Sequence, residues 1–140
     1  MDDRIQLHCR DVDWSAVSQI LKTVGMAYHA PDVHQRAFEA SFAAVFVYRG
    51  DRLVGFGRAL SDGEYQAAVY DCAVVPDLQG QGLGRRIMET LLERVAHCNV
   101  ILYASPGMEG FYQRLGLRRM KTGMARFRDP AAARKRGFTG

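Results

Sequence analysis

Three glycines stand at alternate positions before a predicted helix, at Gly80, Gly82 and Gly84, and Arg85 and Arg86 follow them directly. A helix N-terminus presents main-chain N–H groups without intrahelical partners and the positive end of the helix dipole, so it attracts phosphate oxygens. Glycine lets the main chain approach such a ligand closely, and the arginines add positive charge. A flexible turn with a helix cap is the alternative, but a plain turn seldom requires three alternate glycines. The segment therefore predicts a phosphate-binding loop.

Two well-known phosphate-binding motifs do not fit this segment. A P-loop requires lysine and then serine or threonine after the last glycine, whereas Gly84 is followed by two arginines. A dinucleotide-binding fingerprint requires glycine at the position of Arg85 and an acidic residue about 20 positions later, where this chain has the apolar run ILYAS. The remaining pattern is Gln-x-x-Gly-x-Gly, which Gln79, Gly82 and Gly84 form.

The elements on the N-terminal side of the loop follow from periodicity and turn residues. Residues 5–9 are a strand candidate, and Asp13 is an N-cap candidate for a helix over residues 14–23. Pro31 suits the first turn of a second helix that ends at about residue 40. Turn residues at 50–51 and 61–64 then separate three strands in series, which predicts consecutive antiparallel pairing.

The elements on the C-terminal side begin with a helix whose apolar face is formed by Leu83, Ile87, Leu91, Leu92 and Val95. The apolar run at residues 99–105 predicts a central strand buried on both faces, parallel to residues 65–75 through a right-handed crossover. A short helix over about 109–115 is expected to end at Gly116, and residues 117–127 to supply one or two last strands. Together these elements make an α+β domain with a mixed sheet.

The composition fits a single globular domain, with 140 residues of which 48% are hydrophobic. No apolar run approaches the roughly 18 residues of a membrane span, and the first residues show no signal-peptide pattern, so we expect a cytoplasmic protein without membrane contact. Cys9, Cys72 and Cys98 are scattered and odd in number, which favours reduced, buried thiols. The net charge of +4 suits an anionic partner. Residues 129–140 are interpreted as a basic, solvated tail, with disorder as one alternative and nucleic-acid binding not favoured.

Two stretches resemble signatures of the GCN5-related N-acetyltransferase (GNAT) superfamily. DCAVVPDLQGQGLGRRIMETLLERV resembles its coenzyme A-binding motif, and FYQRLGL, residues 111–117, resembles its second signature. The resemblance covers about residues 5–127, and the stretch before the glycine loop is most similar to small plastid and bacterial amine acetyltransferases. It implies one acetyltransferase domain over residues 1–128, followed by the tail at 129–140. The implied fold is a mixed, mostly antiparallel sheet with splayed fourth and fifth strands, flanked by helices.

The resemblance also implies acetyl-CoA as cosubstrate. Main-chain N–H groups of the loop would wrap its pyrophosphate, at Gln79, Gly80, Gln81, Gly82, Leu83, Gly84 and Arg85. Main-chain atoms of Cys72, Ala73 and Val74 would pair with the pantetheine arm like an added strand. Ser105, at the end of the fifth strand, and Phe111 and Arg114, in the second signature, complete the expected cofactor contacts, although a solvated surface arginine is an equal alternative for Arg114.

The resemblance places a general acid at Tyr112, within reach of the departing sulfur; a packing residue is the alternative. The general base is less clear, because Tyr70 stands where many relatives carry glutamate. Asp71 is adjacent, but strand alternation points it to the opposite face unless a bulge turns it. An alkylamine with a pKa of about 10.4 is neutral in only about one molecule in a thousand at pH 7, so deprotonation costs roughly 4 to 5 kcal/mol. A water chain to Asp71 or Glu64, or an amine that arrives neutral, is the preferred hypothesis.

The acceptor is expected to be a small primary amine, acetylated directly without a covalent enzyme intermediate. Tyr28 and His29, between the first two helices, and Tyr70 are candidates for substrate contact. A protein lysine or N-terminus is the alternative acceptor, and an acetyl-CoA sensor without turnover is the alternative function. None of the four histidines shows metal-ligand spacing, so no metal is expected. A homodimer is compatible with such a fold.

Overall fold

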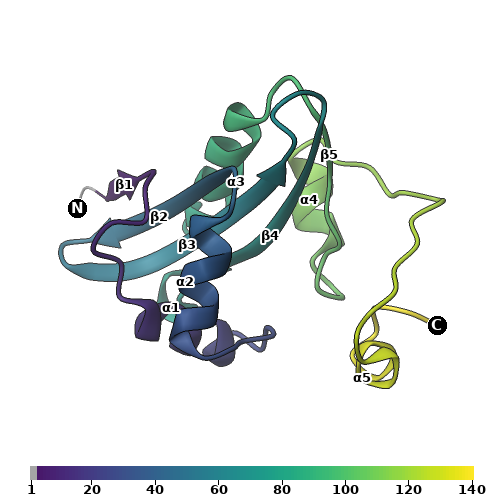
Figure 1. Ribbon diagram of the computed structural model, residues 1–140, viewed down its shortest axis with the longest axis horizontal. Helices are drawn as coiled ribbons and strands as arrows, with labels where there is room; N and C mark the ends of the chain where they lie inside the picture. The colour runs from purple at the N-terminus through teal and green to yellow at the C-terminus, as the bar shows by residue number, and fades with distance from the viewer. Residues whose placement is uncertain (1–2) are drawn as a thin grey trace. The chain divides into compact units, whose positions relative to one another are not determined.

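The computed structural model describes residues 3–140, which form two compact units that divide between Leu102 and Tyr103 (Figure 1). The first unit contains a sheet of five strands in the order β1-β2-β3-β4-β5. The strands are β1 (Arg4–Gln6), β2 (Ala43–Arg49), β3 (Arg52–Ser61), β4 (Gln66–Val74) and β5 (Asn99–Ile101). The first four pair antiparallel in series and β5 pairs parallel with β4, which confirms the mixed sheet.

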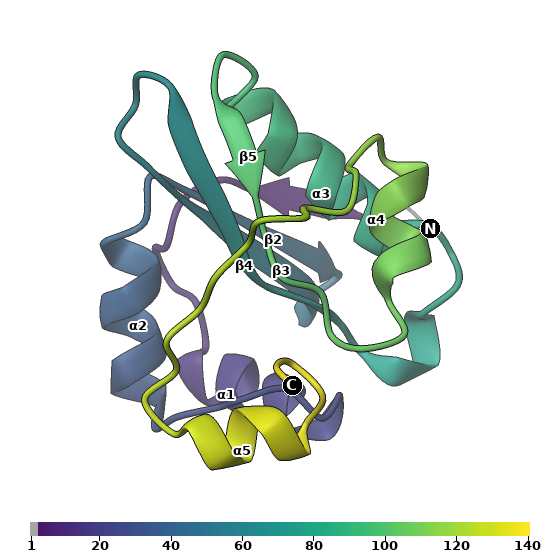
Figure 2. The same cartoon turned by 90° about the vertical axis from the view of Figure 1, so that its right-hand side faces the viewer.

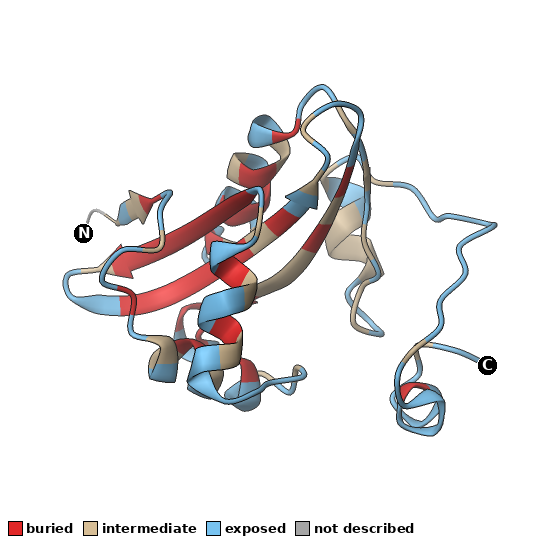
Figure 3. Cartoon of the chain, in the orientation of Figure 1, coloured by how far each residue is buried: buried red, intermediate tan, exposed pale blue. Residues whose placement is uncertain are grey.

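The centre of the sheet lies at β2 and β3, and not at the strand that the sequence predicted. Every residue of β2 except Arg49 is buried, as are most residues of β3 (Figure 3). The expected central strand over residues 99–105 is wrong, because β5 has only three residues and is the edge strand of this sheet. Ile101 is 51% exposed, so the apolar run alone did not distinguish an edge from a centre.

The pairing of β4 with β5 is confined to one end of β4. It joins Gln66–Ala68 to Asn99–Ile101, whereas β4 continues to Val74. The second half of β4 therefore extends beyond its pairing with β5, as the splayed arrangement requires.

Helices α1 (Trp14–Thr23) and α2 (Pro31–Glu39) cover one face of this sheet, and α3 (Leu83–Arg94) covers the other (Figure 2). The predicted N-cap is confirmed, since the Asp13 carboxylate accepts from the N–H groups of Ser15 at 3.0 Å and Ala16 at 3.2 Å. Between the helices and the sheet lies an aromatic cluster in which each ring has a neighbour within 6 Å: Trp14, Phe38, Phe46 and Phe56.

The apolar face of α3 packs closely against β3 at its two glycines, Gly55 and Gly57. Its buried residues are Leu83, Ile87, Met88 and Leu91, with Val95 at the C-cap. Met88 thus takes the place predicted for Leu92, which is only half-buried. A Cβ at Gly57 would lie 2.7 Å from the Cys72 sulfur and 3.0 Å from Leu91, so only glycine allows α3 to approach β3 this closely.

The second unit holds the short helices α4 (Glu109–Arg114) and α5 (Pro130–Lys135). The predicted end of α4 is confirmed: the Gly116 and Leu117 N–H groups donate to the carbonyls of Gln113 and Tyr112, with Gly116 at a φ of +95°. The strands expected over 117–127 are wrong, since this segment has neither helix nor strand. The tail is not disordered throughout, because α5, capped by Asp129, lies within it.

None of the helices formed by residues 3–140 has the length and apolar character that a membrane crossing requires.

Candidate functional site

The glycine loop places an open helix N-terminus at the end of β4. Gly80 and Gly82 adopt φ angles of +80° and +87°, and a Cβ at either position would meet no atom within 4 Å. Gly82 is the N-cap of α3 and provides no side-chain hydrogen bond to the first turn. Because no side chain closes this end of the helix, space remains for a ligand beside the main chain.

The main-chain donors of this first turn are available to an anion. Arg86 is the first residue whose N–H donates within the turn, to the Gly82 carbonyl at 3.0 Å. Within residues 3–140, the preceding N–H groups of Leu83, Gly84 and Arg85 make no hydrogen bond. Three adjacent unpaired donors at the positive end of a helix of 12 residues suit a phosphate or pyrophosphate group.

Side chains hold this loop against the sheet. The Gln79 amide donates to the Val74 carbonyl at 3.0 Å, which ties the loop to the end of β4. The short 3-10 helix η1 (Pro76–Leu78) is joined to β3 by a bidentate pair of Arg52 and Asp77, with distances of 2.8 and 3.0 Å. Gln79 therefore acts on the loop through its side chain, a role that the motif alone did not indicate.

Arg85 is less free to meet an anion than the sequence suggested. Its guanidinium lies 2.7 Å from the Glu89 carboxylate one turn along α3, and both side chains are 56% exposed. Such an exposed pair contributes little to stability and is screened by salt. The main-chain donors are thus better placed to meet an anion than the Arg85 side chain.

A β-bulge turns Asp71 toward the α1/α2 face. Phe56 pairs with Ala73 and Arg58 pairs with Tyr70, so Asp71 and Cys72 together oppose Gly57. Asp71 takes a φ of +57°, which is rare outside glycine. The bulge is the exception to strand alternation that the sequence left open, and it decides the direction of the carboxylate.

Arg58 contacts both Asp71, the candidate base, and Tyr70, a candidate for substrate contact. Its Nε donates to the Asp71 carboxylate at 2.8 Å, and its guanidinium lies 5.5 Å from the centre of the Tyr70 ring. From α2, Phe38 lies under the same guanidinium at 5.6 Å. Asp71 and Arg58 are only 22% and 16% exposed, so this is a partly desolvated ion pair. Sequence reasoning missed Arg58, and its only signal was a cation in the middle of the apolar stretch that follows Arg52 in β3.

His34 fixes the loop between α1 and α2. Its Nε2 accepts the His29 N–H at 2.8 Å, and the imidazole is 3% exposed. Burial lowers the pKa of His34, and the nearby Asp71 opposes this shift. The neutral ring is the form that can accept this bond, so His34 is a structural residue here. The side chains of Tyr28 and His29 are exposed beside it, with Lys22 positioned 5.7 Å from the Tyr28 ring centre.

The Cys72 thiol faces away from any ligand that pairs with the β4 main chain. It lies 3.3 Å from the Met88 sulfur, and its enclosure raises the pKa of Cys72 to about 12. The residue as a whole is half-buried. Cys9 and Cys98 are likewise half-buried rather than buried, and all three are free thiols.

The second signature forms α4 in the second unit. Tyr112 is half-buried, and its ring contacts Phe111 edge-on at a centroid distance of 5.0 Å. Ser105 does not lie at a strand end, because β5 ends four residues earlier, at Ile101; instead its carbonyl accepts the Met108 N–H at 2.9 Å. Arg114 is exposed.

Comparison with known proteins identifies relatives for most of this chain. Residues 12–127 match a family model described as Acetyltransferase (GNAT) domain. The chain is 33% identical over 114 residues to an uncharacterized ycf52-like N-acetyltransferase of Prochlorococcus marinus, covering 76% of this chain and 63% of the relative. It is 36% identical over 112 residues to serotonin N-acetyltransferase 2, chloroplastic, of Oryza sativa, covering 75% of this chain and 56% of the relative. The alignments thus span less than two thirds of these two relatives.

A solved structure shows the same fold. A GNAT-family acetyltransferase of Streptococcus pneumoniae matches with a TM-score of 0.77 at 25% identity, covering 91% of this chain and all of that one. The family match covers residues 12–127, and the open N-terminus of α3 and the bulge in β4 lie within them. This chain therefore belongs to the GNAT acetyltransferase family.

Proposed function

We propose that this protein is an acetyl-CoA-dependent N-acetyltransferase that transfers acetyl directly to the primary amine of a small molecule. The observation that carries the proposal is the open N-terminus of α3, with unpaired N–H groups at Leu83, Gly84 and Arg85. These donors and the space beside Gly80 and Gly82 fit a pyrophosphate. Acetyl-CoA would supply the acetyl group as an activated thioester.

The second half of β4 is proposed to hold the arm of the cosubstrate. On one side, Ala73 and Val74 pair with Phe56 and Gly55 of β3. Pairing of β4 with β5 stops at Ala68, so residues 72–74 suit a ligand that adds to the strand. The enclosed Cys72 thiol takes no part, which favours direct transfer over an acyl-enzyme.

Asp71 is proposed to assist the removal of a proton from the amine. The bulge aims its carboxylate at the α1/α2 face, where Arg58 orients it. Because one carboxylate oxygen already accepts from Arg58, proton transfer through a water chain is more plausible chemistry than direct abstraction. Tyr70, His29 and Tyr28 are proposed to contact the acceptor from the same side of the sheet as α1 and α2.

Tyr112 is proposed as the proton donor to the departing thiolate, with Phe111 fixing its ring. Ser105 and Arg114 remain proposed cofactor contacts. The serotonin N-acetyltransferase name of one relative makes arylalkylamines the first acceptors to try.

The test is release of free CoA thiol from acetyl-CoA across arylalkylamines, polyamines, amino acids and lysine peptides. Turnover on a small amine that falls about a hundredfold in Tyr112→Phe, with unchanged CoA affinity, supports the proposal. Turnover confined to lysine peptides would indicate a protein acceptor. Tight acetyl-CoA binding with no turnover on any amine would instead indicate a sensor.

A further inference from the structure

The loop between α1 and α2 is anchored through the main chain of His29. Its N–H donates to Nε2 of His34 on α2 at 2.8 Å, and its carbonyl accepts from the Ser18 hydroxyl of α1. The main chain of the two preceding residues, Ala27 and Tyr28, makes no hydrogen bond to any of residues 3–140. The two bonds of His29 therefore fix the part of the loop that presents Tyr28.

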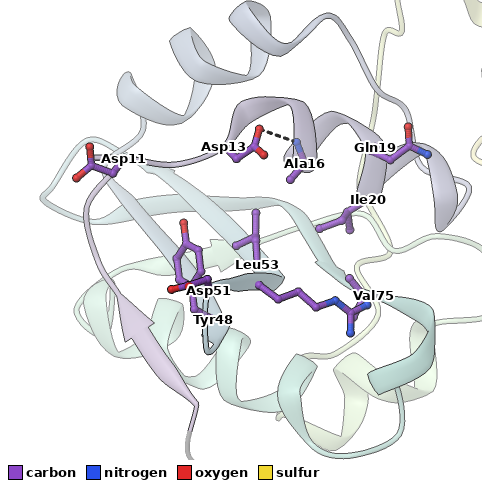
Figure 4. Close-up of a pocket in the computed structure, with 10 residues that line it drawn as sticks. Asp11, Asp13, Ala16, Gln19, Ile20, Tyr48, Asp51, Leu53 and Val75 are labelled. Carbon is purple, nitrogen blue, oxygen red and sulfur yellow. Dashed lines mark hydrogen bonds between the residues drawn. The ribbon is translucent and has the colours of Figure 1, made fainter.

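The helices on either side of the loop are held without this contact. The Asp13 carboxylate caps the start of α1 through the Ala16 N–H (Figure 4), and one face of that helix is buried. α2 is held by Phe38, which packs in the aromatic cluster. Loss of the bond to His34 should thus release the loop and leave both helices in place.

His34 can hold the loop only as a neutral ring. Because Nε2 accepts a hydrogen bond, the single proton of the ring is on Nδ1. A second proton, on Nε2, would face the His29 N–H and replace the bond with a contact between two donors. His34 is 3% exposed and lies on the buried face of α2, so a charged ring would also be poorly solvated there.

The charged groups that face His34 come from the loop and from two strands. Burial has the largest effect and lowers the pKa of His34; Asp71 of β4 opposes it, and His29 and Arg58 of β3 add to the lowering. The Asp71 carboxylate is already paired with Arg58 at 2.8 Å, so its support for a positive ring is reduced. From α1, the group at this anchor is the uncharged Ser18 hydroxyl. The ring is therefore neutral at pH 7.

We propose that His34 is a positioning residue for the acceptor amine, because its neutral imidazole holds the loop that carries Tyr28 and His29. The inference rests on the proposed function, in which these two side chains contact the amine. His34 itself acts through the main chain of His29. Amine binding should weaken when the ring is charged or is replaced by a side chain that accepts no hydrogen bond. Binding of acetyl-CoA at the N-terminus of α3 should not change.

Two substitutions separate the hydrogen bond of His34 from its packing. His34→Gln places an amide oxygen near the position of Nε2 and stays uncharged, whereas His34→Leu fills the site with a side chain that accepts no hydrogen bond. His8→Asn is the matched control. The His8 Nδ1 also accepts a main-chain N–H, from Arg10 at 3.2 Å, but this residue is exposed and follows β1.

Kinetics on the full chain use acetyl-CoA and 2-phenylethylamine. At pH 7.5, His34→Leu should raise the KM for the amine roughly three- to tenfold, the effect of one hydrogen bond, with kcat and the KM for acetyl-CoA unchanged. His34→Gln and His8→Asn should match the parent. As the pH falls below about 6.5, the amine KM of the parent should rise above that of His34→Gln, because only the parent ring gains a proton.

Amide hydrogen exchange at pH 7.5 tests the anchor without turnover. The His29 amide should lose protection about tenfold in His34→Leu and keep it in His34→Gln. If the chain acetylates no amine, the proposed function fails, and this exchange result still decides whether His34 holds the loop.

Three results would overturn the inference. The first is equal protection of the His29 amide in the parent and in His34→Leu. The second is a His34→Gln variant as impaired as His34→Leu, which would attribute the effect to packing. The third is an amine KM that depends on pH identically in the parent and in His34→Gln.

Discussion

Replacing Gly82 with alanine separates the cofactor role of the loop from its backbone strain. Gly82 has a φ of +87°, and a Cβ built there meets no protein atom within 4 Å. The substitution should therefore cost about 1 to 2 kcal/mol of stability from the left-handed conformation alone. The new methyl group would occupy open space beside the unpaired N–H groups of α3, where we place the pyrophosphate.

Gly25→Ala is the matched control for this strain. Gly25 follows α1 with a φ of +80° and also has no atom within 4 Å of a built Cβ. Urea unfolding should show both variants destabilised by similar amounts, about 1 to 2 kcal/mol. Calorimetric titration with coenzyme A should then separate them, with Kd raised about tenfold or more in Gly82→Ala and unchanged in Gly25→Ala.

The refuting result is an equal coenzyme A affinity in the two variants at equal stability. It would mean that the ligand does not approach the loop main chain at Gly82. A loss of affinity in both variants would attribute the effect to general destabilisation and would equally contradict a specific role for the loop.

The other predictions concern the β4 bulge and the helix faces beside it. Gly57→Ala should destabilise the fold by about 1 to 3 kcal/mol in urea unfolding, because its Cβ would lie 2.7 Å from the Cys72 sulfur. Gly123→Ala is the control in the same assay, because a Cβ there would have no atom nearer than 3.8 Å. Asp71→Asn should lower kcat/KM, and a profile of kcat/KM against pH that matches the parent would exclude Asp71 as base. Burial lowers the pKa of His34 in the folded chain, so folding stability should fall as the pH drops below about 6.5, the pKa of the unfolded chain. Denaturant titrations at several pH values measure this dependence. A His34→Gln variant whose stability depends on pH in the same way would contradict the prediction.

Local signals in the sequence predicted most of the first unit. Asp13, Pro31 and the turn at Gly50 act through neighbouring backbone groups, so α1, α2 and the β2–β3 hairpin could be placed from residue types alone. The glycine loop was predictable for the same reason, since Gly80 and Gly82 are needed where φ is positive. The end of α4 at Gly116 was also predictable from a local signal, the glycine that follows the helix.

The errors fall where long-range packing decides. The apolar run at 99–105 satisfies the pattern of a buried strand, but its position at the sheet edge depends on the order of all five strands. Residues 117–127 carry few β-branched or aromatic side chains, so no local signal supported the strands expected there. Met88, and not Leu92, lies on the buried face of α3, where its sulfur is 3.3 Å from the Cys72 sulfur of β4.

By itself, the sequence predicted a glycine-rich helix start that suits an anion, and its family resemblance led to the proposal of Tyr112 and Asp71 for proton transfer. These depend on residue type and near neighbours. Only the tertiary structure decided which way Asp71 faces, because the bulge opposite Gly57 exists only when β3 and β4 pair. The same pairing brings Arg58 to Asp71 across 13 positions of sequence. The fold likewise brings Asp11 and Asp13, before α1, near Tyr48 and Asp51 of the β2–β3 hairpin, because only tertiary packing relates these two segments.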